Sequence, residues 1–316
     1  MGQNENINEK WLFIVNPAAG GGRVGKRWPG IEQQLRFTGI PFDVVFTEKK
    51  LHATFLAAQA IQQGRRKLAA VGGDGTGNEV VNGIFQQTAC PVEEVTFTML
   101  PAGTGNDWIK THRIPKNSGA WIKFFQQATT SFQDIGWLTF RENGNEQKRY
   151  FFNVAGLSYD AYVAQRADAY KSLVSNTIFY LFLIFRCLFE FKIPRIRLRF
   201  DGKTVEEGLY TINAGICRYS GGGLQLVPQA LPNDGKLALT YARRISKLEV
   251  LLITPLFYLG KIGWHPAVKL LQAEEITVDS LENQPVLVEA DGEFLGETPV
   301  SMGILKTKLK ILVPSH

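Results

Sequence analysis

Cysteine is scarce in this sequence of 316 residues. Cys90, Cys187 and Cys217 are the three that it contains, and none of them is close in sequence to another. Disulfide-stapled secreted domains and structural zinc sites both need several cysteines at short intervals. The sequence therefore excludes both classes and favours a protein that folds in a reducing compartment.

Long apolar runs are also missing. Residues 1–10 are polar and lack the apolar core of a signal peptide. The most membrane-like stretch is 173–193, where an apolar run of eight residues, Ile178 to Phe185, precedes Arg186 and further charges. A spanning helix needs about 20 apolar residues. We therefore expect a helix that is buried or that faces a membrane, without crossing it.

Neither sign of charge dominates the composition. Lys and Arg number 35 against 29 Asp and Glu, which leaves a net charge of +6, and hydrophobic residues make up 45%. At about 150 residues per domain, the length predicts two globular domains. This mild positive charge does not require a nucleic-acid partner, and we expect none. It suits an anionic partner such as a nucleotide or a membrane surface.

The first third of the sequence alternates between strand and helix patterns. Short apolar runs predict strands, and the stretches between them predict helices at 28–37 and 52–63; the strands are Trp11 to Val15, Phe42 to Phe46, Leu68 to Val71 and Val95 to Leu100. Such alternation is typical of a parallel sheet covered by helices. We predict an α/β domain over residues 11–133.

The pattern changes after about residue 134. Segments rich in Val, Ile, Phe and Tyr predict strands at 150–154, 195–200, 208–214, 236–241, 276–280, 286–289 and 308–313, with helices at 172–191 and 247–262. Turn signals such as Asn-Asp-Gly at 233–235 separate several of these strands. We predict a mainly antiparallel β-sandwich with a helical insertion over residues 134–313, its C-terminal tail able to pack back on the first domain.

The first glycine-rich segment, 20–27, fits two phosphate-binding patterns incompletely. Gly20, Gly22 and Gly25 match G-x-G-x-x-G, but Asp43 begins the second strand, whereas a dinucleotide site needs the acid at its end. The P-loop pattern needs Ser or Thr after Lys26 to hold magnesium, and Arg27 stands there. A loop without a ligand is the third interpretation.

Two further glycine-rich segments resemble each other. The segments 72–79 and 101–107 both contain Gly-Thr-Gly-Asn followed by an acid, and each directly follows a predicted strand and opens a predicted helix. Glycine lets the backbone approach phosphate oxygens, and a helix N-terminus offers free amides. Two ordinary turns would explain neither the match nor Asp74 between glycines, since a carboxylate beside phosphate needs a bridging cation.

These segments resemble the diacylglycerol kinase catalytic domain superfamily, and among its members the soluble bacterial lipid kinases of the YegS and DgkB type. Gly72 to Thr76 resembles the family signature, and 101–107 its second glycine loop. Residues 232–237 and 291–293 resemble motifs of its second domain. The motifs follow the family's order from residue 11 to about 313. The resemblance implies an NAD-kinase-like first domain and transfer of the ATP γ-phosphate to a lipid hydroxyl.

The resemblance also implies site residues. The nucleotide cleft would be lined by Asn16, Pro17, Gly20, Thr47, Gly72, Gly73, Asp74, Gly75, Thr76, Asn78, Glu79, Gly103, Thr104 and Asn106. Asp74 would act on the phosphates through Mg²⁺. Glu293 matches the family's proton acceptor, and Asp291 is the alternative base. A structural magnesium would be held by Asp234 and the backbone carbonyls of Leu231 and Lys236.

Several functions remain open at this point. A lipid kinase is favoured, with diacylglycerol or a related lipid alcohol as acceptor, because the apolar helical stretch suits a lipid. An NAD(P)-dependent oxidoreductase, an NAD kinase and a non-catalytic lipid- or nucleotide-binding protein are the alternatives. We expect a cytoplasmic, peripherally membrane-associated protein that is a monomer or a homodimer.

Overall fold

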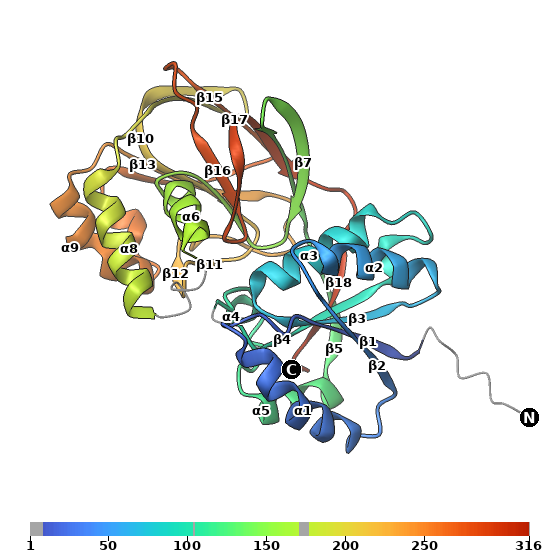
Figure 1. Cartoon of the computed structure of the whole chain (residues 1–316). Coiled ribbons are helices and arrows are strands. Elements are labelled where there is room, and N and C mark those ends of the chain that lie inside the picture. The colour runs from blue at the N-terminus through green and yellow to red at the C-terminus, as the bar shows by residue number, and fades with distance from the viewer. Residues whose placement is uncertain (1–8, 104, 171–176, 316) are drawn as a thin grey trace, which may run out of the picture. The chain divides into compact units, whose positions relative to one another are not determined.

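The computed structural model describes residues 9–103, 105–170 and 177–315, and the chain forms two compact units. The first unit comprises Met1–Gln133 with Thr307–His316, and the second comprises Asp134–Lys306. The C-terminal segment thus returns to the first unit and supplies a strand to its sheet (Figure 1).

The first unit contains a six-stranded sheet in the order β2-β1-β3-β4-β18-β5. Five of these strands are parallel, and β5 is antiparallel to β18. All five side chains of β1 are buried, as expected for a strand covered on both faces. The strands are β1 Trp11–Val15, β2 Phe42–Phe46, β3 Lys67–Gly72, β4 Thr96–Pro101, β5 Thr129–Gln133 and β18 Leu309–Val313.

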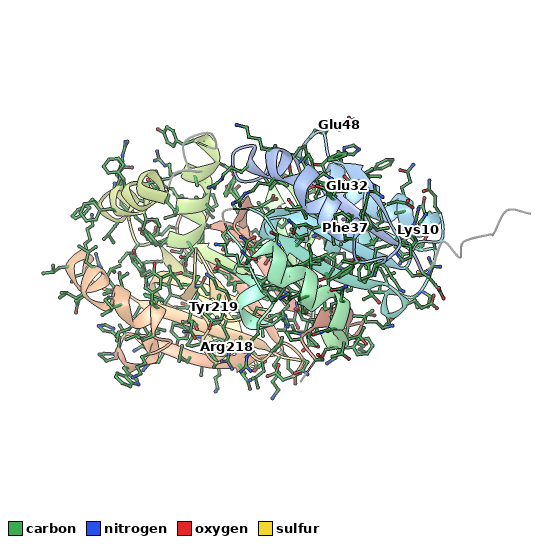
Figure 2. The ribbon with its side chains drawn as sticks, turned by 90° about the horizontal axis from the view of Figure 1, so that it is seen from below. Lys10, Glu32, Phe37, Glu48, Arg218 and Tyr219 are labelled. Atoms are coloured by element: carbon green, nitrogen blue, oxygen red, sulfur yellow. The ribbon has the colours of Figure 1, made fainter. Side chains whose placement is uncertain are left out.

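Helices pack on this sheet through faces that the sequence spacing predicts. Helix α1 buries Val24, Trp28, Ile31 and Leu35, which recur every three or four residues. Phe37, just beyond its end, is 82% exposed (Figure 2). The helices of the first unit are α1 Arg23–Arg36, α2 His52–Gln62, α3 Asp74–Gln86, α4 Trp108–Thr111 and α5 Ser118–Gln127, with a 3-10 turn at Val92–Glu94.

Small residues let α2 lie directly against α3. The buried face of α2 includes Ala53, Ala57 and Ala60. A Cβ atom at Gly83 of α3 would collide with the carbonyl oxygen of Thr54 and would lie 2.7 Å from the Cβ of Ala57. This close packing fixes α3, whose first turn forms part of the candidate site described below.

The second unit is built on a ten-stranded, antiparallel sheet that closes on itself. Strand β10 pairs with β9 through its first half and with β8 and β13 through its second half, so the path from β8 through β16, β17, β15 and β9 returns to β10. The strands are β6 Gly136–Glu142, β7 Asn145–Phe151, β8 Val154–Ser158, β9 Arg195–Phe200, β10 Lys203–Gly215, β13 Leu237–Arg243, β14 Val268–Ala273, β15 Glu275–Ser280, β16 Leu287–Ala290 and β17 Glu293–Ile304.

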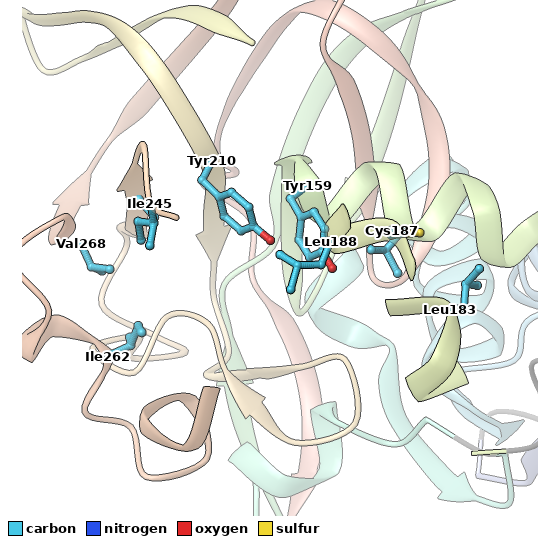
Figure 3. Close-up of a cluster of buried hydrophobic side chains, with 10 residues drawn as sticks. Tyr159, Leu183, Cys187, Leu188, Tyr210, Ile245, Ile262 and Val268 are labelled. Atoms are coloured by element: carbon cyan, nitrogen blue, oxygen red, sulfur yellow. The ribbon is translucent and has the colours of Figure 1, made fainter. Parts of the chain in front are cut away.

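Among the described residues, the helices α6 Tyr159–Ala169, α8 Thr177–Glu190 and α9 Lys247–Tyr258 lie beside this sheet, and a 3-10 turn at Ile262–Trp264 follows α9. They share a buried cluster in which the rings of Tyr159 and Tyr210 stack 4.8 Å apart (Figure 3). A capping box of Ser246 and Glu249 explains where α9 begins. Across the described part of the chain, no helix is long and apolar enough to cross a membrane.

The predicted fold class is confirmed, but several elements differ from the sequence expectation. The predicted strand 150–154 is two strands, β7 and β8, which are separated at Phe152 and Asn153. The hairpin of β6 and β7 escaped prediction although its turn, Asn143-Gly144, carries the typical signal, and both residues have positive φ, 52° and 80°. Of the predicted helix 172–191, residues 172–176 lie outside the described residues.

Candidate active site

Four loops meet along one edge of the parallel sheet in the first unit. Each follows the carboxyl end of a strand: Asn16 follows β1, Thr47 follows β2, Gly73 follows β3 and Ala102 follows β4. Backbone hydrogen bonds join neighbours along this edge, from the Asn16 amide to the Val71 carbonyl at 3.0 Å and from the Ala102 amide to the Gly72 carbonyl at 2.9 Å. Ligands of open α/β sheets bind at this edge.

Asn16 links the first loop to helix α3. Its side-chain nitrogen donates to the Thr76 hydroxyl at 3.1 Å, and its side-chain oxygen accepts from the Ala18 amide at 3.1 Å. Both contacts use the carboxamide, so Asn16 and Thr76 are held in one orientation. These two residues of the predicted nucleotide set therefore come together.

The N-terminus of α3 forms the centre of this edge. Gly73 has an extended backbone and precedes the helix without a side-chain cap, and Asp74 is the first helical residue. The first amides of a helix have no intrahelical partner, and the helix dipole adds partial positive charge. The start of this 13-residue helix is therefore suited to bind an anion such as phosphate.

The glycines of the two matching loops are required where the loops touch each other. A Cβ atom at Gly103 would lie 2.6 Å from both the nitrogen and the Cα of Gly73. A Cβ atom at Gly72 would collide with the Thr76 hydroxyl inside the segment 72–79 itself. The sequence assigned these glycines to phosphate approach alone, whereas the structure also uses the missing side chains for contact between the loops.

Asp74 ties the glycine loop that follows β4, residues 101–107, to the glycine loop that follows β3, residues 72–79. Its carboxylate accepts hydrogen bonds from the amide of Asp107, at 2.9 and 3.1 Å, and from the amide of Trp108 at 3.2 Å. Burial and, next, the nearby Asp107 carboxylate raise the pKa of Asp74 to about 6. The side chain is therefore both a structural tether and an acid whose charge is costly without a counterion.

Asp107 belongs to the site, although the predicted set omitted it. It is 3% exposed, and its carboxylate pairs with Lys110 at 2.6 Å. The acid that follows each Gly-Thr-Gly-Asn segment was the sequence signal for it. Asp107 thus adds a second buried carboxyl group whose charge acts on Asp74.

This arrangement fits a magnesium ion that is shared with phosphates. Among the described residues, no group of three or more His, Cys, Asp or Glu side chains could hold a metal by itself. Mg²⁺ commonly binds one or two carboxylates and completes its shell with substrate phosphates and water. The raised pKa of Asp74 is consistent with such a site, because a cation would relieve the cost of its buried charge.

The glycine-rich segment 20–27 approaches the loop that follows β4. Gly20, Gly21 and Gly22 all have left-handed backbones, and a Cβ atom at Gly20 would lie 3.4 Å from the Ala102 carbonyl. Gly25 packs against Pro17, where a Cβ atom would meet Pro17 at 3.2 Å. The loop therefore folds toward the same edge, with Lys26 exposed.

Asp43 lies at the other end of its strand. It is the second residue of β2, opposite Leu12 of β1, and its carboxylate binds Arg65 and Lys10, the latter at 3.5 Å. A dinucleotide site needs its ribose-binding acid at the carboxyl end of that strand. The geometry thus provides no support for a dinucleotide site built on the Gly20 loop.

Two of the predicted nucleotide residues have structural roles. Glu79 accepts from the amides of Leu51 at 2.9 Å and Ala53 at 3.1 Å, so both of its carboxylate oxygens hold the start of α2. Asn106 donates to the Gly103 carbonyl at 2.9 Å and shapes the second loop. Thr104 lies outside the described residues.

In the second unit, Asp291 and Glu293 have different surroundings. Asp291 is 5% exposed, and its carboxylate accepts from the amides of Phe152, Asn153 and Val154, each at 3.0 Å. These bonds satisfy the backbone where β7 ends and β8 begins. The side chain of Glu293 is 21% exposed and lies 3.4 Å from Arg149. Glu293 is therefore the carboxylate that a substrate can reach.

The predicted structural magnesium site is a turn that is already hydrogen-bonded. One oxygen of Asp234 accepts from the Lys236 amide at 3.1 Å and the other from Gln272 at 2.8 Å. Each carboxylate oxygen has a second lone pair that remains for a metal. Leu231 is 47% exposed. The donor types fit a hard cation, and the site stays a prediction.

Comparison with known families assigns both units. Residues 10–137 match the diacylglycerol kinase catalytic domain, and residues 153–313 match the YegS C-terminal NAD kinase beta sandwich-like domain. The chain is 27% identical over 310 residues to a diacylglycerol kinase of Staphylococcus saprophyticus, and the alignment covers 98% of this chain and 97% of the relative. It is 28% identical over 309 residues to that of Staphylococcus epidermidis, covering 98% and 93%.

Solved structures show the same fold. A diacylglycerol kinase from Bacillus anthracis superposes with a TM-score of 0.69 at 19% identity, covering 97% of each chain. Yeast NADH kinase, solved in complex with NADH, superposes with a TM-score of 0.51 at 9% identity, covering 99% of this chain and 85% of that chain. At these identities the likeness concerns the fold alone.

Gly103→Ala tests the contact between the two glycine loops. The new methyl group would collide with the backbone of Gly73, so we expect a loss of about 1–3 kcal/mol in the free energy of unfolding and at least about tenfold weaker ATP binding. Gly30→Ala on α1 is the matched control, because a Cβ atom there meets nothing within 4 Å. Urea unfolding and ATP titration measure both. Equal behaviour of the two variants would refute the contact.

Proposed function

The chain belongs to the diacylglycerol kinase catalytic domain superfamily, as a bacterial lipid kinase of the YegS and DgkB type, and we propose that it transfers the γ-phosphate of ATP to the hydroxyl of diacylglycerol or a related lipid alcohol. The observation that carries this proposal is the edge where Asn16, Asp74 and the glycine loops surround the start of α3. That edge offers amides to phosphates and two carboxyl groups to a cation.

We assign the residues of this chain as follows. The amides at the start of α3 and the glycine loops bind the nucleotide phosphates, because these groups are fixed before the substrate arrives. Asp74 and Asp107 would hold Mg²⁺, which when bound neutralises charge on the phosphates. Glu293 takes the proton of the lipid hydroxyl as its oxygen forms the new bond to phosphorus. The bond from phosphorus to the ADP oxygen breaks, and ADP leaves with that electron pair.

We further propose that the protein acts at the surface of a membrane from the cytoplasm. Large apolar side chains are exposed on neighbouring elements of the second unit: Phe182, Phe185 and Phe189 on α8, Leu248 and Leu252 on α9, and Trp264 just beyond. Lysines accompany them, with Lys247 lying 5.5 Å from the ring of Phe189 and Lys261 lying 4.5 Å from that of Trp264. Apolar side chains beside cations suit an anionic bilayer surface.

Asp74→Asn tests the assigned role of this acid. The amide retains an oxygen that can accept from Asp107 and Trp108, but it removes the charge, so the melting temperature should change little while turnover falls by at least about 10²-fold. Asp74→Ala would also release the second loop and is the less specific variant. Retention of more than about a tenth of the wild-type turnover by Asp74→Asn would contradict the mechanism.

Glu293→Gln should lower turnover by about 10² to 10⁴, which is the usual effect of losing a general base, with unchanged ATP affinity. Asp291→Asn is the comparison. Its amide cannot accept all the bonds of the carboxylate, so this variant should lower the melting temperature. Steady-state kinetics and thermal unfolding separate the two effects. If Asp291→Asn keeps its stability and loses turnover while Glu293→Gln stays active, the base is Asp291.

The double variant Phe182→Ser/Phe185→Ser should lower activity on anionic vesicles by at least about tenfold and leave activity on a short-chain, water-soluble diacylglycerol unchanged. Phe37→Ser is the matched control, since Phe37 is 82% exposed but belongs to the first unit. Added salt should weaken vesicle binding of the wild type, because it screens the lysines. Vesicle activity that survives the double variant would contradict the proposed membrane contact.

A further inference from the structure

Gln133, at the end of β5, lies in a buried hydrogen-bond cluster that the assigned mechanism does not use. The side-chain oxygen of this fully buried residue lies 2.7 Å from Nε1 of Trp108 and 2.6 Å from Nε2 of His112. Trp108 begins α4 and His112 follows its last residue. A buried amide side chain is costly unless its polar atoms are bonded, so the cluster needs an explanation.

The chemistry of the three side chains fixes the direction of both bonds. An indole N–H can only donate, so the atom of Gln133 that faces Trp108 is the carboxamide oxygen. The same oxygen faces His112, whose Nε2 must therefore carry a proton and donate as well. Burial lowers the pKa of His112 to about 4, although the bond to Gln133 opposes this effect, so the ring is neutral near pH 7. One oxygen thus accepts from a residue at each end of α4.

Helix α4 depends on contacts outside itself. It has four residues, and Asp107 precedes it without a side-chain capping bond. Such a short helix is not stable by its own hydrogen bonds. The ring of Trp108 is fully buried and lies 5.5 Å from that of Phe97 on β4, between centroids. Apolar packing is not directional, whereas the hydrogen bond to Gln133 is, and so it sets the orientation of the indole.

Trp108 transmits this orientation to Asp74. Its backbone amide donates to the Asp74 carboxylate at 3.2 Å, beside the Asp107 amide at 2.9 Å. Trp108 is therefore bonded to Gln133 by its side chain and to Asp74 by its backbone. A shift of the indole would move the amides that hold Asp74. It would also move Asp107, the second carboxyl group assigned to magnesium.

We propose that Gln133 is a positioning residue for phosphoryl transfer, which acts through Trp108 to orient Asp74 and Asp107 toward magnesium and the phosphates of ATP. The proposal rests on the kinase function and adds to it a residue that no motif of the sequence singles out. Gln133 is paired with Leu309 of β18, so its backbone belongs to the sheet and provides a rigid support. A misplacement of about 1 Å at a reacting group can lower the rate about 10²-fold, so a remote support can matter.

The first experiment removes the acceptor. Gln133→Met keeps the length of the side chain but loses the oxygen to which Trp108 and His112 donate. We expect kcat to fall at least about tenfold and half-maximal activity to need at least about threefold more magnesium. The KM for dioctanoylglycerol should stay within about twofold, because the assigned base lies in the second unit. A kcat within about twofold of the wild type would overturn the proposal.

Gln127→Met is the control for this variant. It makes the same exchange at an exposed position at the end of α5, and its kcat and magnesium requirement should stay within about twofold of the wild type.

The second experiment compares two tryptophans and decides the question if Gln133→Met does not fold. Trp121 is also fully buried in the first unit, and its indole donates to the Met99 carbonyl at 2.8 Å. Trp108→Phe and Trp121→Phe should both lower the melting temperature, but only Trp108→Phe should lower kcat at least about tenfold. Equal kcat values for the two variants would overturn the proposal.

The double variant Gln133→Met/Trp108→Phe tests whether Gln133 acts through Trp108. Each single exchange removes the same hydrogen bond, so the two losses in kcat should not multiply. We expect the kcat of the double variant to lie within about threefold of that of the slower single variant. Losses that multiply would show independent effects and would contradict the route through Trp108.

The third experiment does not depend on activity. Hydrogen exchange of Gln133→Met without ATP or magnesium should be at least about tenfold faster than in the wild type for residues 105–111 and unchanged for α1. Equal rates for residues 105–111 would overturn the proposal. If exchange responds as expected but the wild type phosphorylates no lipid, the kinase function fails and the contact stands. If the wild type is an active lipid kinase and Gln133→Met keeps its kcat, the positioning role fails alone.

Discussion

The carboxylate of Asp74 is the interaction on which the first unit's site depends. It binds the amides of Asp107 and Trp108 and thereby attaches the loop after β4 to the helix that follows β3. The contact between Gly103 and Gly73 fixes the spacing of the same two loops. The carboxylate of Asp74 and the absence of side chains at Gly73 and Gly103 therefore fix a surface of amides and carboxyl groups before any ligand binds. Phosphoryl transfer needs such a preorganised surface.

The same reasoning explains why the carboxyl groups of the second unit divide their work. Asp291 completes the backbone hydrogen bonds at the break between β7 and β8, and so it holds the turn on which Glu293 stands. Glu289, two residues before Asp291, is buried and accepts from the amide of Gly292 in that turn. Three acids within five residues thus differ in what they do: Asp291 and Glu289 hold the backbone of the turn, and Glu293 is the accessible carboxylate.

Much of the fold could be predicted from the sequence because burial and periodicity are local signals. The runs at β1 to β4 alternate with helices, and this pattern alone predicts the parallel sheet with its loops at one edge. The β6–β7 hairpin was missed even though Asn143-Gly144 signals it, because β7 is mostly polar and exposed. Such a strand lacks the alternation of apolar and polar residues from which strands are predicted.

The site was predicted less completely, for a different physical reason. A motif identifies which residues gather but does not say what each carboxylate contacts. Glu79 lies in the signature segment, yet its oxygens hold the start of α2, and Asp291 lies in the late acidic motif, yet it binds three amides. Asp160 and Glu289 belong to no motif that the sequence singled out. Asp160 binds Thr211 and Asn213, and Glu289 binds the Gly292 amide, and these contacts depend on tertiary packing.

The central claim is that this chain transfers phosphate from ATP to a lipid hydroxyl. The most direct test incubates the purified full chain with ATP labelled on its γ-phosphate, magnesium and anionic vesicles that contain diacylglycerol, and then extracts the lipids. The account predicts label in phosphatidic acid, and none when magnesium is chelated or diacylglycerol is omitted. If no label enters diacylglycerol or any lipid of a total bacterial extract, while the protein is folded and binds ATP, the account is contradicted.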